Sequence, residues 1–449
     1  MFFQPPPAAP TMSLPERLFK LHEHGTSMRT EALAGLTTFL TMSYIVFVNP
    51  AILATTGMDP GAVFVATCLA AALGSAVMAL AANFPVGMAP GMGLNAFFAF
   101  TVVGAAGLPW EQALAAVLLS GIVFLLLTVT GVRRWLVDGI PTSLRSAIVA
   151  GIGLFLAIVA LQKSGVVIGD ADTLVRLGPM TEPEPLLALG GFLLIAILEA
   201  RRVRGAILIG ILAVTASAWA LGLVEWRGLV SLPPSLEPTL FKLDLPGLLH
   251  WEEGAGLSVL LQVVLVFVLV EVFDATGTLY GVASRAGLLK LADGQKRFGR
   301  ALLADSTAIL AGSLLGTSST TAYAESASGV QAGGRTGLTA LVVAALFLAA
   351  LLFSPLAAMV PPYATAPALL FVAGLMLREL VEIEWEELTE AVPAALCALA
   401  MPFTYSIANG LAFGFIAYAV LKAGTGRWRQ VHPAVWLVAG LFALRYALA

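Results

Sequence analysis

Long apolar stretches, separated by short polar connections, recur along the whole chain. A run of about 20 mainly apolar residues is long enough to cross the hydrocarbon core of a bilayer as a helix. The pattern predicts fourteen spans, at 31–53, 62–82, 86–103, 112–131, 142–161, 186–200, 206–223, 256–280, 301–315, 316–333, 338–353, 363–377, 388–401 and 405–423. A last apolar run, 433–448, carries Arg445, and we expect it to lie at the membrane interface, with an additional span as the alternative.

The third and tenth spans depart from the pattern of an uninterrupted helix. The stretch 85–98 is broken by glycine and proline, and the stretch 316–329 is rich in hydroxyl residues. We expect each to form a short extended strand followed by a half-helix, which is tolerated at membrane depth only where protein or a water-filled cavity satisfies the backbone. Each is the third span in a block of seven, and two tandem blocks of seven have opposite orientations. The sequence therefore predicts an all-α polytopic membrane protein with a 7+7 inverted repeat, the plan of secondary transporters.

The composition agrees with a membrane protein. Of the 449 residues, 59% are hydrophobic and 11% are charged, and the mean hydropathy is +0.92. A soluble domain carries about 25% charged residues because its surface faces water. The net charge of −3 points to no particular partner, and the basic stretch 285–300 is expected to contact lipid rather than nucleic acid.

The distribution of basic residues predicts the orientation. With the N-terminus inside, nineteen Lys and Arg residues lie in cytoplasmic stretches, including Arg133, Arg134 and the basic stretch just named, and four lie outside. This positive-inside bias places the chain in the cell (inner) membrane as a multi-pass protein with a cytoplasmic N-terminus.

Cysteine and histidine give no sign of a metal or cofactor site. Cys68 and Cys397 lie in apolar runs far apart in the sequence, which is typical of packing residues. All four histidines lie in polar stretches between apolar runs. We therefore expect no cofactor and no metal, and any proton chemistry inside the membrane has to use carboxylates.

Ionisable residues within the predicted spans are candidates for function, because burying charge in a membrane is expensive. The eighth span carries Glu271 and Asp274, which at i and i+3 share one helix face. Glu325 stands at the start of the tenth-span half-helix, where the free N–H groups and the helix dipole favour a carboxylate. Asn95 of the third span supplies both hydrogen-bond donors and acceptors.

This set suits a planar ligand with adjacent N–H groups, such as guanine, hypoxanthine or another lactam heterocycle. Phe97, Phe98 and Tyr323 could stack on such a base, although packing is the plainer role for each. Burial and a neighbouring like charge both disfavour an ionised carboxyl group, so one of Glu271 and Asp274 is expected to load and release a proton near neutral pH. A satisfied ion pair or helix cap is the structural alternative for these two carboxylates. The hydroxyl run 317–321 is expected either to line the cavity or to satisfy neighbouring backbone groups.

Several stretches resemble a known family. They are Phe19 to Phe39, Thr41 to Pro50, Gly91-Met-Gly-Leu-Asn-Ala-Phe-Phe-Ala-Phe, Phe273-Asp-Ala-Thr-Gly-Thr-Leu and Ala324-Glu-Ser-Ala-Ser-Gly-Val. Together they resemble the AzgA-like adenine/guanine/hypoxanthine permease branch of the nucleobase–cation symporters (nucleobase/ascorbate transporters). The resemblance runs from about residue 18 to beyond residue 420.

The resemblance implies import of adenine, guanine and hypoxanthine with protons, and a homodimer as the family expectation. It implies that the base is bound by Asp274 and Glu325, with Asn95 tied to purine recognition. We expect Glu271, Asp274 and Glu325 to take part in proton coupling, with Glu271 in an assisting role. The residues Gly93, Phe97, Thr278, Ala324 and Ser326 complete the expected substrate-binding set. Other branches have histidine at the position of Thr278, so a histidine relay does not carry over.

The resemblance also implies two domains that shift past each other in an elevator-like movement. The core domain would comprise residues 29–131 and 255–354, and the gate domain residues 132–223 and 355–424. Residues 1–28 would form a cytoplasmic segment, 224–254 an extracytoplasmic connection and 425–449 a C-terminal segment.

Three other functions stay open. An anion transporter for sulfate or bicarbonate on the same fold would want a positive site at the half-helices, and a transporter of other nucleobases would use the same carboxylates. A membrane-embedded enzyme would need a nucleophile–base set or metal spacing, which the sequence does not offer. The sequence neither ranks the purines nor decides between proton and sodium coupling.

Overall fold

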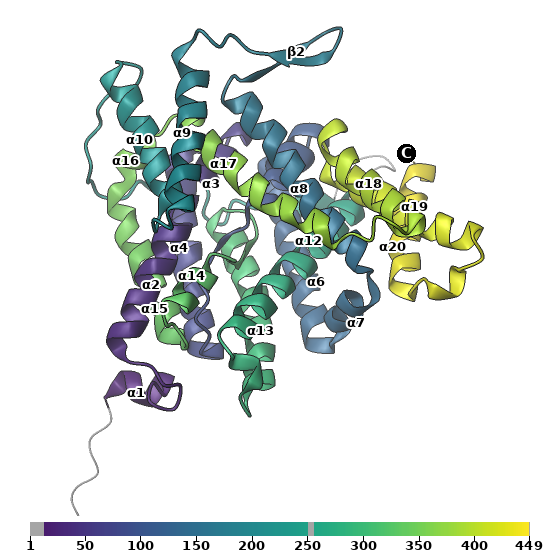
Figure 1. Ribbon diagram of the computed structural model, residues 1–449, viewed down its shortest axis with the longest axis horizontal. Coiled ribbons are helices and arrows are strands. Elements are labelled where there is room, and N and C mark those ends of the chain that lie inside the picture. Colours follow the sequence, from purple (N-terminus) through teal and green to yellow (C-terminus); the bar gives the residue numbers. More distant parts are fainter. Residues whose placement is uncertain (1–12, 250–255, 449) are drawn as a thin grey trace, which may run out of the picture.

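The computed structural model describes residues 13–249 and 256–448, and it is dominated by helices (Figure 1). Residues 1–12, 250–255 and 449, which include parts of the predicted N-terminal segment and of the long connection, lie outside the described residues. The α-helices are α1 (Leu14–Phe19), α2 (Met28–Met42), α3 (Ile45–Leu53), α4 (Pro60–Val77), α5 (Met92–Ala96), α6 (Trp110–Thr130), α7 (Val132–Gly139), α8 (Thr142–Lys163), α9 (Pro183–Ala200), α10 (Ala206–Ala220), α11 (Leu245–Leu249), α12 (Gly256–Arg285), α13 (Gly294–Leu315), α14 (Ser326–Gln331), α15 (Gly337–Ala350), α16 (Ser354–Met359), α17 (Pro362–Met376), α18 (Leu388–Phe403), α19 (Ile407–Gly424) and α20 (Pro433–Leu448).

Shorter elements connect or extend these helices. Four strands are present among the described residues: β1 (Met88–Pro90), β2 (Val167–Asp170), β3 (Leu174–Leu177) and β4 (Thr320–Ala322). Two π-helical segments, η2 (Met78–Ala82) and η3 (Phe97–Ala105), continue α4 and α5. The 3₁₀ segments are η1 (Ala54–Thr56), η4 (Leu288–Lys290), η5 (Leu351–Phe353), η6 (Leu377–Glu382) and η7 (Trp428–Gln430).

Helices, or a strand with a half-helix, occupy all fourteen predicted spans. Within the described residues, ten helices are long and apolar enough to cross a membrane, and four shorter helices are apolar. The helical membrane fold is therefore confirmed, while the number of spans that cross the bilayer stays a prediction. The last apolar run forms α20, which packs against α19, α12 and α7.

Both interrupted spans have the form that the sequence predicts. In the third span, strand β1 leads into α5 and the π-helical segment η3, and in the tenth, strand β4 leads into α14. The two strands pair antiparallel, with Met88 opposite Ala322 and Pro90 opposite Thr320. Their pairing satisfies backbone groups that an isolated strand would leave without partners in an apolar environment.

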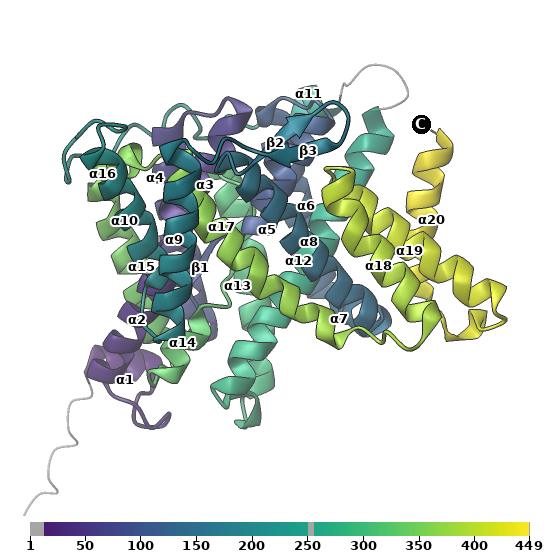
Figure 2. The ribbon, with the colours of Figure 1, turned by 45° about the horizontal axis from the view of Figure 1, so that its top comes forward.

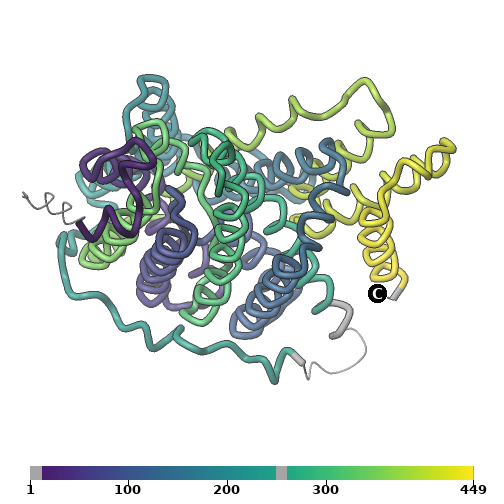
Figure 3. The backbone as a smooth tube through the Cα atoms, turned by 90° about the horizontal axis from the view of Figure 1, so that it is seen from below, coloured from purple at the N-terminus to yellow at the C-terminus, as the bar shows by residue number. Residues whose placement is uncertain are grey.

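The helices pack in two groups. Contacts join α2, α3, α4, α6, α12, α13 and α15 to one another, and a second set of contacts joins α8, α9, α10, α17, α18 and α19. Figure 2 shows α18 and α19 on one side of α8 and the pair α2 and α15 on the other. Viewed from below, the N-terminal and C-terminal helices lie at opposite sides of the molecule (Figure 3).

Helices α2 and α15 approach closely because small and polar residues lie at their contact. A Cβ atom added at Gly35 would lie 2.6 Å from the Cβ of Val342, so only glycine fits there. The buried carboxylate of Glu31 accepts hydrogen bonds from the backbone N–H groups of Arg335, Thr336 and Thr339, at 2.9, 3.3 and 3.2 Å. These donors begin α15, so Glu31 of α2 fixes the start of its neighbour.

The connections contain structure that the hydrophobic pattern does not signal. Helix α7 follows α6 directly, and β2 and β3 form an antiparallel hairpin after α8. In the hairpin turn, the backbone N–H groups of Thr173 and Asp172 donate to Asp170 and hold the pKa of its carboxyl group below the usual range.

Three of the basic residues assigned to cytoplasmic stretches are buried. Arg133 and Arg297 are 2% and 3% exposed, and Lys422 is 4% exposed. Lys422 pairs with Glu390 at 2.8 Å, and Arg297 donates to the backbone carbonyl of Ala82 at 3.4 Å, where the segment η2 ends. The expectation that the whole stretch 285–300 contacts lipid is therefore wrong for Arg297, because its guanidinium caps a helix end instead.

Candidate functional site

The candidate site lies where the two strand–half-helix units meet. Besides the β1–β4 pairing, the N–H of Gly91 donates to the carbonyl of Ser319 at 2.9 Å, and the N–H of Tyr323 donates to the carbonyl of Gly87 at 3.0 Å. The hydroxyl of Tyr323 donates to the Pro90 carbonyl at 2.6 Å. Because the strands are antiparallel, the start of α5 lies beside Ser319 and the start of α14 lies beside Gly87, at the two ends of the short strand pair. The pairing thus brings Asn95 and Glu325, from distant parts of the chain, to the two ends of one strand pair.

Glu325 is held by a tyrosine that the sequence reading missed. Its carboxylate is partly buried and accepts a 2.6 Å hydrogen bond from the hydroxyl of Tyr44, which lies between α2 and α3. Glu325 occupies the N-cap position of α14, but its side chain makes no capping hydrogen bond. The partner of the carboxylate is therefore a side chain of the first span rather than the N–H groups of its own helix. The signal was the phenol within an apolar run, because a buried tyrosine hydroxyl needs a partner.

The two acidic residues of α12 have different surroundings. Glu271 is fully buried; its Oε1 accepts from the Ser319 hydroxyl at 2.6 Å, and its Oε2 has no hydrogen-bond partner among the described residues. Asp274, one turn further on, is exposed. An ionised carboxylate is costly where it is buried and incompletely paired, whereas an exposed one keeps its hydration. The two carboxylates are therefore suited to different tasks.

One face of α12 is open from Asp274 to the end of the helix. Gly277 and Gly281 follow Asp274 at i+3 and i+7, and a Cβ added at either would meet no atom within 4 Å. Toward the start of α12, the same face carries three buried side chains, those of Val263, Phe267 and Val270. The exposed positions of this face therefore lie toward the end of α12, at the end of the molecule that also carries α1 (Figure 2).

Asn95 is buried beside β4. Its Oδ1 accepts a hydrogen bond from Ser318, and its Nδ2 has no partner among the described residues. An amide N–H₂ that is buried without an acceptor is costly, and such a group can be satisfied by a ligand or by water. Asn95 thus keeps donor capacity free at the start of the third-span half-helix.

The hydroxyl run 317–321 hydrogen-bonds to polar side chains of other helices. Thr317 accepts from Asn49 at 2.8 Å, Ser318 and Ser319 donate to Asn95 and Glu271, and Thr321 donates to Asp305 at 3.1 Å. All five residues are at most 1% exposed. The hydroxyls of Thr317, Ser318, Ser319 and Thr321 thus bond to buried side chains, whereas Thr320 Oγ1 has no partner among the described residues. These bonds match neither role expected from the sequence, an open cavity lining or the satisfaction of neighbouring backbone groups.

The remaining candidates divide between open and packed positions. Ala324 is exposed and Thr278 is partly buried, one turn beyond Asp274. Ser326 is buried and accepts from the N–H of Gly87 at 3.0 Å, so it fastens α14 to the segment before β1. Gly93 lies against α8, where an added Cβ would be 2.9 Å from the Cγ2 of Ile152.

The aromatic residues occupy packed positions. Phe97 and Phe98 are fully buried and Tyr323 is 5% exposed. Phe97 packs edge-to-face on Phe267 with ring centroids 4.8 Å apart. Packing, the plainer role weighed for them, is what the structure shows; stacking on a base would need their rings to be uncovered.

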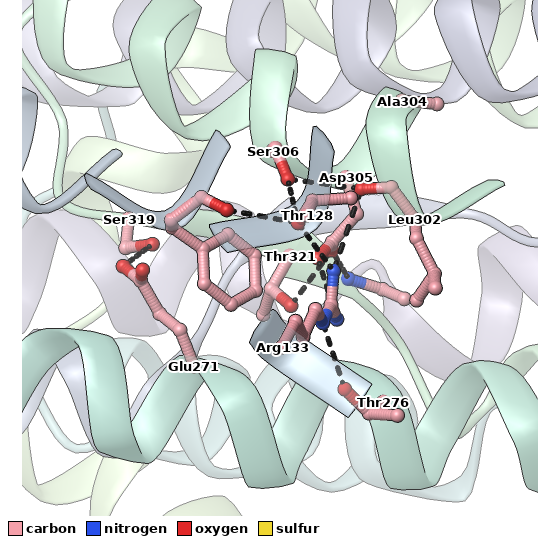
Figure 4. Close-up of polar contacts among 12 residues, drawn as sticks. Thr128, Arg133, Glu271, Thr276, Leu302, Ala304, Asp305, Ser306, Ser319 and Thr321 are labelled. Atoms are coloured by element: carbon pink, nitrogen blue, oxygen red, sulfur yellow. Dashed lines mark hydrogen bonds and ion pairs between the residues drawn. The ribbon is translucent and has the colours of Figure 1, made fainter. Parts of the chain in front are cut away.

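A buried ion pair lies next to these carboxylates, and the sequence reading did not single it out (Figure 4). Arg133 of α7 and Asp305 of α13 are 3.5 Å apart, with side chains 2% and 0% exposed. Asp305 lies within a predicted span, so its acidic type in an apolar run was the available signal. Arg133 was counted with the basic residues of a cytoplasmic loop, and only its burial reveals its role.

Comparison with known proteins gives the chain a family. Residues 29–413 match the profile of the Permease family. The chain is 51% identical over 430 residues to the adenine permease AdeP of Escherichia coli, covering 96% of this chain and 95% of that protein. It is 44% identical over 445 residues to the guanine/hypoxanthine permease PbuO of Bacillus subtilis, covering 95% and 99%.

The fold is similar to that of solved transporters with little sequence identity. The transmembrane domain of the cyanobacterial bicarbonate transporter BicA superposes with a TM-score of 0.63 at 18% identity, over 85% of this chain and 97% of that domain. At this identity the likeness concerns the fold alone, and it agrees with the inverted-repeat architecture expected from the sequence.

Proposed function

The chain belongs to the Permease family, and from this premise we propose that it imports purine nucleobases together with protons. The observation that carries the proposal is that α12 packs against α14 and the carboxylates of Asp274 and Glu325 interact electrostatically, beside the strand pair that leads to Asn95, whose Nδ2 has no partner among the described residues. Among the relatives, AdeP is named an adenine permease and PbuO a guanine/hypoxanthine permease. We therefore propose adenine, guanine and hypoxanthine as the substrates.

The proposed recognition follows from hydrogen-bond chemistry. Purine bases present N–H donors next to ring-nitrogen and carbonyl acceptors. In our proposal the carboxylates of Asp274 and Glu325 accept from the N–H groups, and the Nδ2 of Asn95 donates to an acceptor on the same base. The exposed Ala324 and the partly buried Thr278 border this position. A charged acceptor strengthens each such bond relative to a neutral one.

Coupling to protons is assigned to the acidic residues. The site's described residues include no histidine, and Glu271 is a fully buried carboxyl group with one oxygen free of partners. A proton on Glu271 would remove the cost of a buried charge, and its release would restore that cost, so its occupancy can follow the access of the site to water. We propose that Glu271 carries the coupling proton, with Asp274 and Glu325 contributing through their charge.

For alternating access we propose an elevator-like shift of the two helix groups. The group containing β1, β4 and α12 would form the core, and the group containing α8, α17, α18 and α19 would form the gate. The excess of basic residues in alternate connections supports an inner-membrane protein with a cytoplasmic N-terminus. In that orientation the open end of α12 faces the cytoplasm.

An inorganic anion is less well supported than a purine as the substrate. Although the fold resembles that of a bicarbonate transporter, the groups nearest the half-helices here are carboxylates. An anion in this position would meet like charge unless all of them were protonated. The buried Arg133 does not change this, because Asp305 already pairs with it.

Uptake of radiolabelled adenine and hypoxanthine tests the proposal, in cells that lack their own purine permeases, with and without a protonophore. We expect uptake that the protonophore abolishes and that unlabelled guanine competes. Uptake that depends on sodium and survives the protonophore would contradict proton coupling. Absence of uptake for all three bases, with the protein present in the membrane, would contradict the purine assignment.

A further inference from the structure

Arg133 is a buried guanidinium outside the set of candidate substrate contacts. It lies on α7, the short helix between α6 and α8, and its side chain is 2% exposed. Its Nε donates to the Thr276 hydroxyl at 2.9 Å and its Nη1 to the Leu302 carbonyl at 3.4 Å, while the guanidinium lies 4.2 Å from the ring centre of Phe124. Burying an arginine costs free energy unless its charge is paired and its N–H groups are hydrogen-bonded. The contacts of Arg133 therefore indicate that the fold holds its side chain in one defined position.

The partner of Arg133 reaches the tenth span. Asp305 faces Arg133 with Oδ2, and its Oδ1 accepts from the Thr321 hydroxyl at 3.1 Å and the Ala322 N–H at 3.2 Å (Figure 4). Both donors belong to β4, the strand that leads to Glu325. Asp305 therefore links Arg133 to β4, so the position of Arg133 helps to fix where the second half-helix begins.

One guanidinium thus connects α12, which carries Asp274, with β4, the strand that leads to Glu325. Through Thr276 it holds α12 two residues beyond Asp274, and through Asp305 it holds β4 at Thr321 and Ala322, four and three residues before Glu325. We propose that Arg133 is a positioning residue for purine binding, which sets the spacing between the carboxylates of Asp274 and Glu325. This inference rests on the proposed purine transport, and it assigns to Arg133 a role that does not require contact with the base.

The charge of Arg133 has a second effect. Glu271, Asp274 and Glu325 lie in the same region, and Asp305 is a fourth carboxylate, which interacts electrostatically with Glu271 and Asp274. The positive charge of Arg133 offsets the negative charge of Asp305, so Asp305 repels the charges of the binding carboxylates less. Positioning and charge balance make different predictions, because only positioning requires the hydrogen bond to Thr276.

The experiment compares KM and maximal rate of adenine uptake with the unfolding temperature of the purified full-length protein. Arg133→Gln is expected to raise KM by about tenfold or more, since a small misplacement of binding groups is costly. Arg133→Lys should also raise KM, because the ammonium group of lysine cannot replace the planar guanidinium that donates to two partners. Thr276→Val removes only the hydroxyl acceptor and should raise KM while the unfolding temperature is retained.

The double variant Arg133→Gln with Asp305→Asn covers the case in which the single variant does not fold. Removing both charges avoids an uncompensated buried carboxylate, so the protein should fold, and KM should stay raised because the link between α12 and β4 is lost. The matched control is Arg134→Gln, since Arg134 is the adjacent arginine, is 88% exposed and pairs with the exposed Asp138 of its own helix; its KM should equal that of the wild type.

Wild-type KM in both Thr276→Val and the double variant would overturn the positioning role and leave charge balance as the function of the pair. A wild-type protein that takes up no purine would instead overturn the proposed function, and this inference with it. The two failures are distinguishable because the first appears only in the variants.

Discussion

The hydroxyl of Tyr44 donates a 2.6 Å hydrogen bond to Oε1 of Glu325, across 281 positions of sequence. It joins the turn between α2 and α3 to the N-cap of α14. Because a carboxylate binds a ligand best when its own orientation is fixed, this bond prepares Glu325 for a substrate.

Replacement of Tyr44 by phenylalanine should therefore weaken purine binding without removing a charge. A hydrogen bond to a charged group contributes about 1.5–3 kcal/mol, so we expect KM for adenine uptake to rise by about tenfold. The matched control is Tyr446→Phe, which removes a 2.9 Å hydrogen bond to Asn409 far from the site and should leave KM unchanged. If Tyr44→Phe has the same KM as Tyr446→Phe and the wild type, Tyr44 does not orient Glu325 for binding.

The binding carboxylates themselves should tolerate no neutral substitution. Glu325→Gln and Asp274→Asn each replace an anionic acceptor by an amide that presents a donor to the N–H edge of the base. We expect both variants to abolish uptake while reaching the membrane at wild-type levels, as measured by surface labelling. Glu386→Gln, in an exposed loop, is the control and should transport normally. Normal uptake by either site variant would refute its assignment.

The open face of α12 can be tested by chemical labelling. Both native cysteines, Cys68 and Cys397, are fully buried, so an introduced cysteine can be detected over a low background. Gly281→Cys should react with a membrane-impermeant maleimide in inside-out vesicles and be protected by adenine. Val270→Cys, on the closed part of the same helix face, should stay unlabelled. Labelling of Gly281→Cys only from the outside would reverse the proposed orientation.

A stability prediction concerns the contact between α2 and α15. Glu31→Gln keeps the size of the side chain but leaves one oxygen to accept from the N–H groups of Arg335, Thr336 and Thr339. Each buried donor left without a partner costs about 1–3 kcal/mol, so the unfolding temperature in detergent should fall. KM for adenine should not change, because Glu31 is bonded to the start of α15 and not to the candidate site. Glu23→Gln, whose carboxylate is 61% exposed, is the control and should unfold at the wild-type temperature.

The sequence predicted the two interrupted spans because glycine, proline and hydroxyl residues within an apolar run cannot form an ordinary spanning helix. It also selected Glu271, Asp274 and Glu325, since an acidic residue in such a run stands out by residue type alone. It passed over Asp305, which carries the same signal within the ninth predicted span. Their roles in binding and coupling stay predictions.

The partners of these groups could not be obtained in the same way. Whether the side chain of Arg133 is exposed or buried depends on how α7 packs beside α12 and α13. A single sequence does not show which helices pack together. The same applies to Tyr44, whose partner belongs to the other repeat. Phe97 was expected either to stack on a base or to pack, and only its contact with Phe267 shows that it packs.

The sequence by itself determined the membrane environment, the helical spans, the interrupted segments and the residues that carry charge within them. These properties depend on hydropathy and residue type, which act locally along the chain. The tertiary structure alone decided which oxygen of Glu271 and of Glu325 accepts a hydrogen bond, which face of α12 is open and where the guanidinium of Arg133 lies. Hydrogen bonds and ion pairs require atoms within a few ångströms, and that proximity arises only when helices distant in sequence pack together.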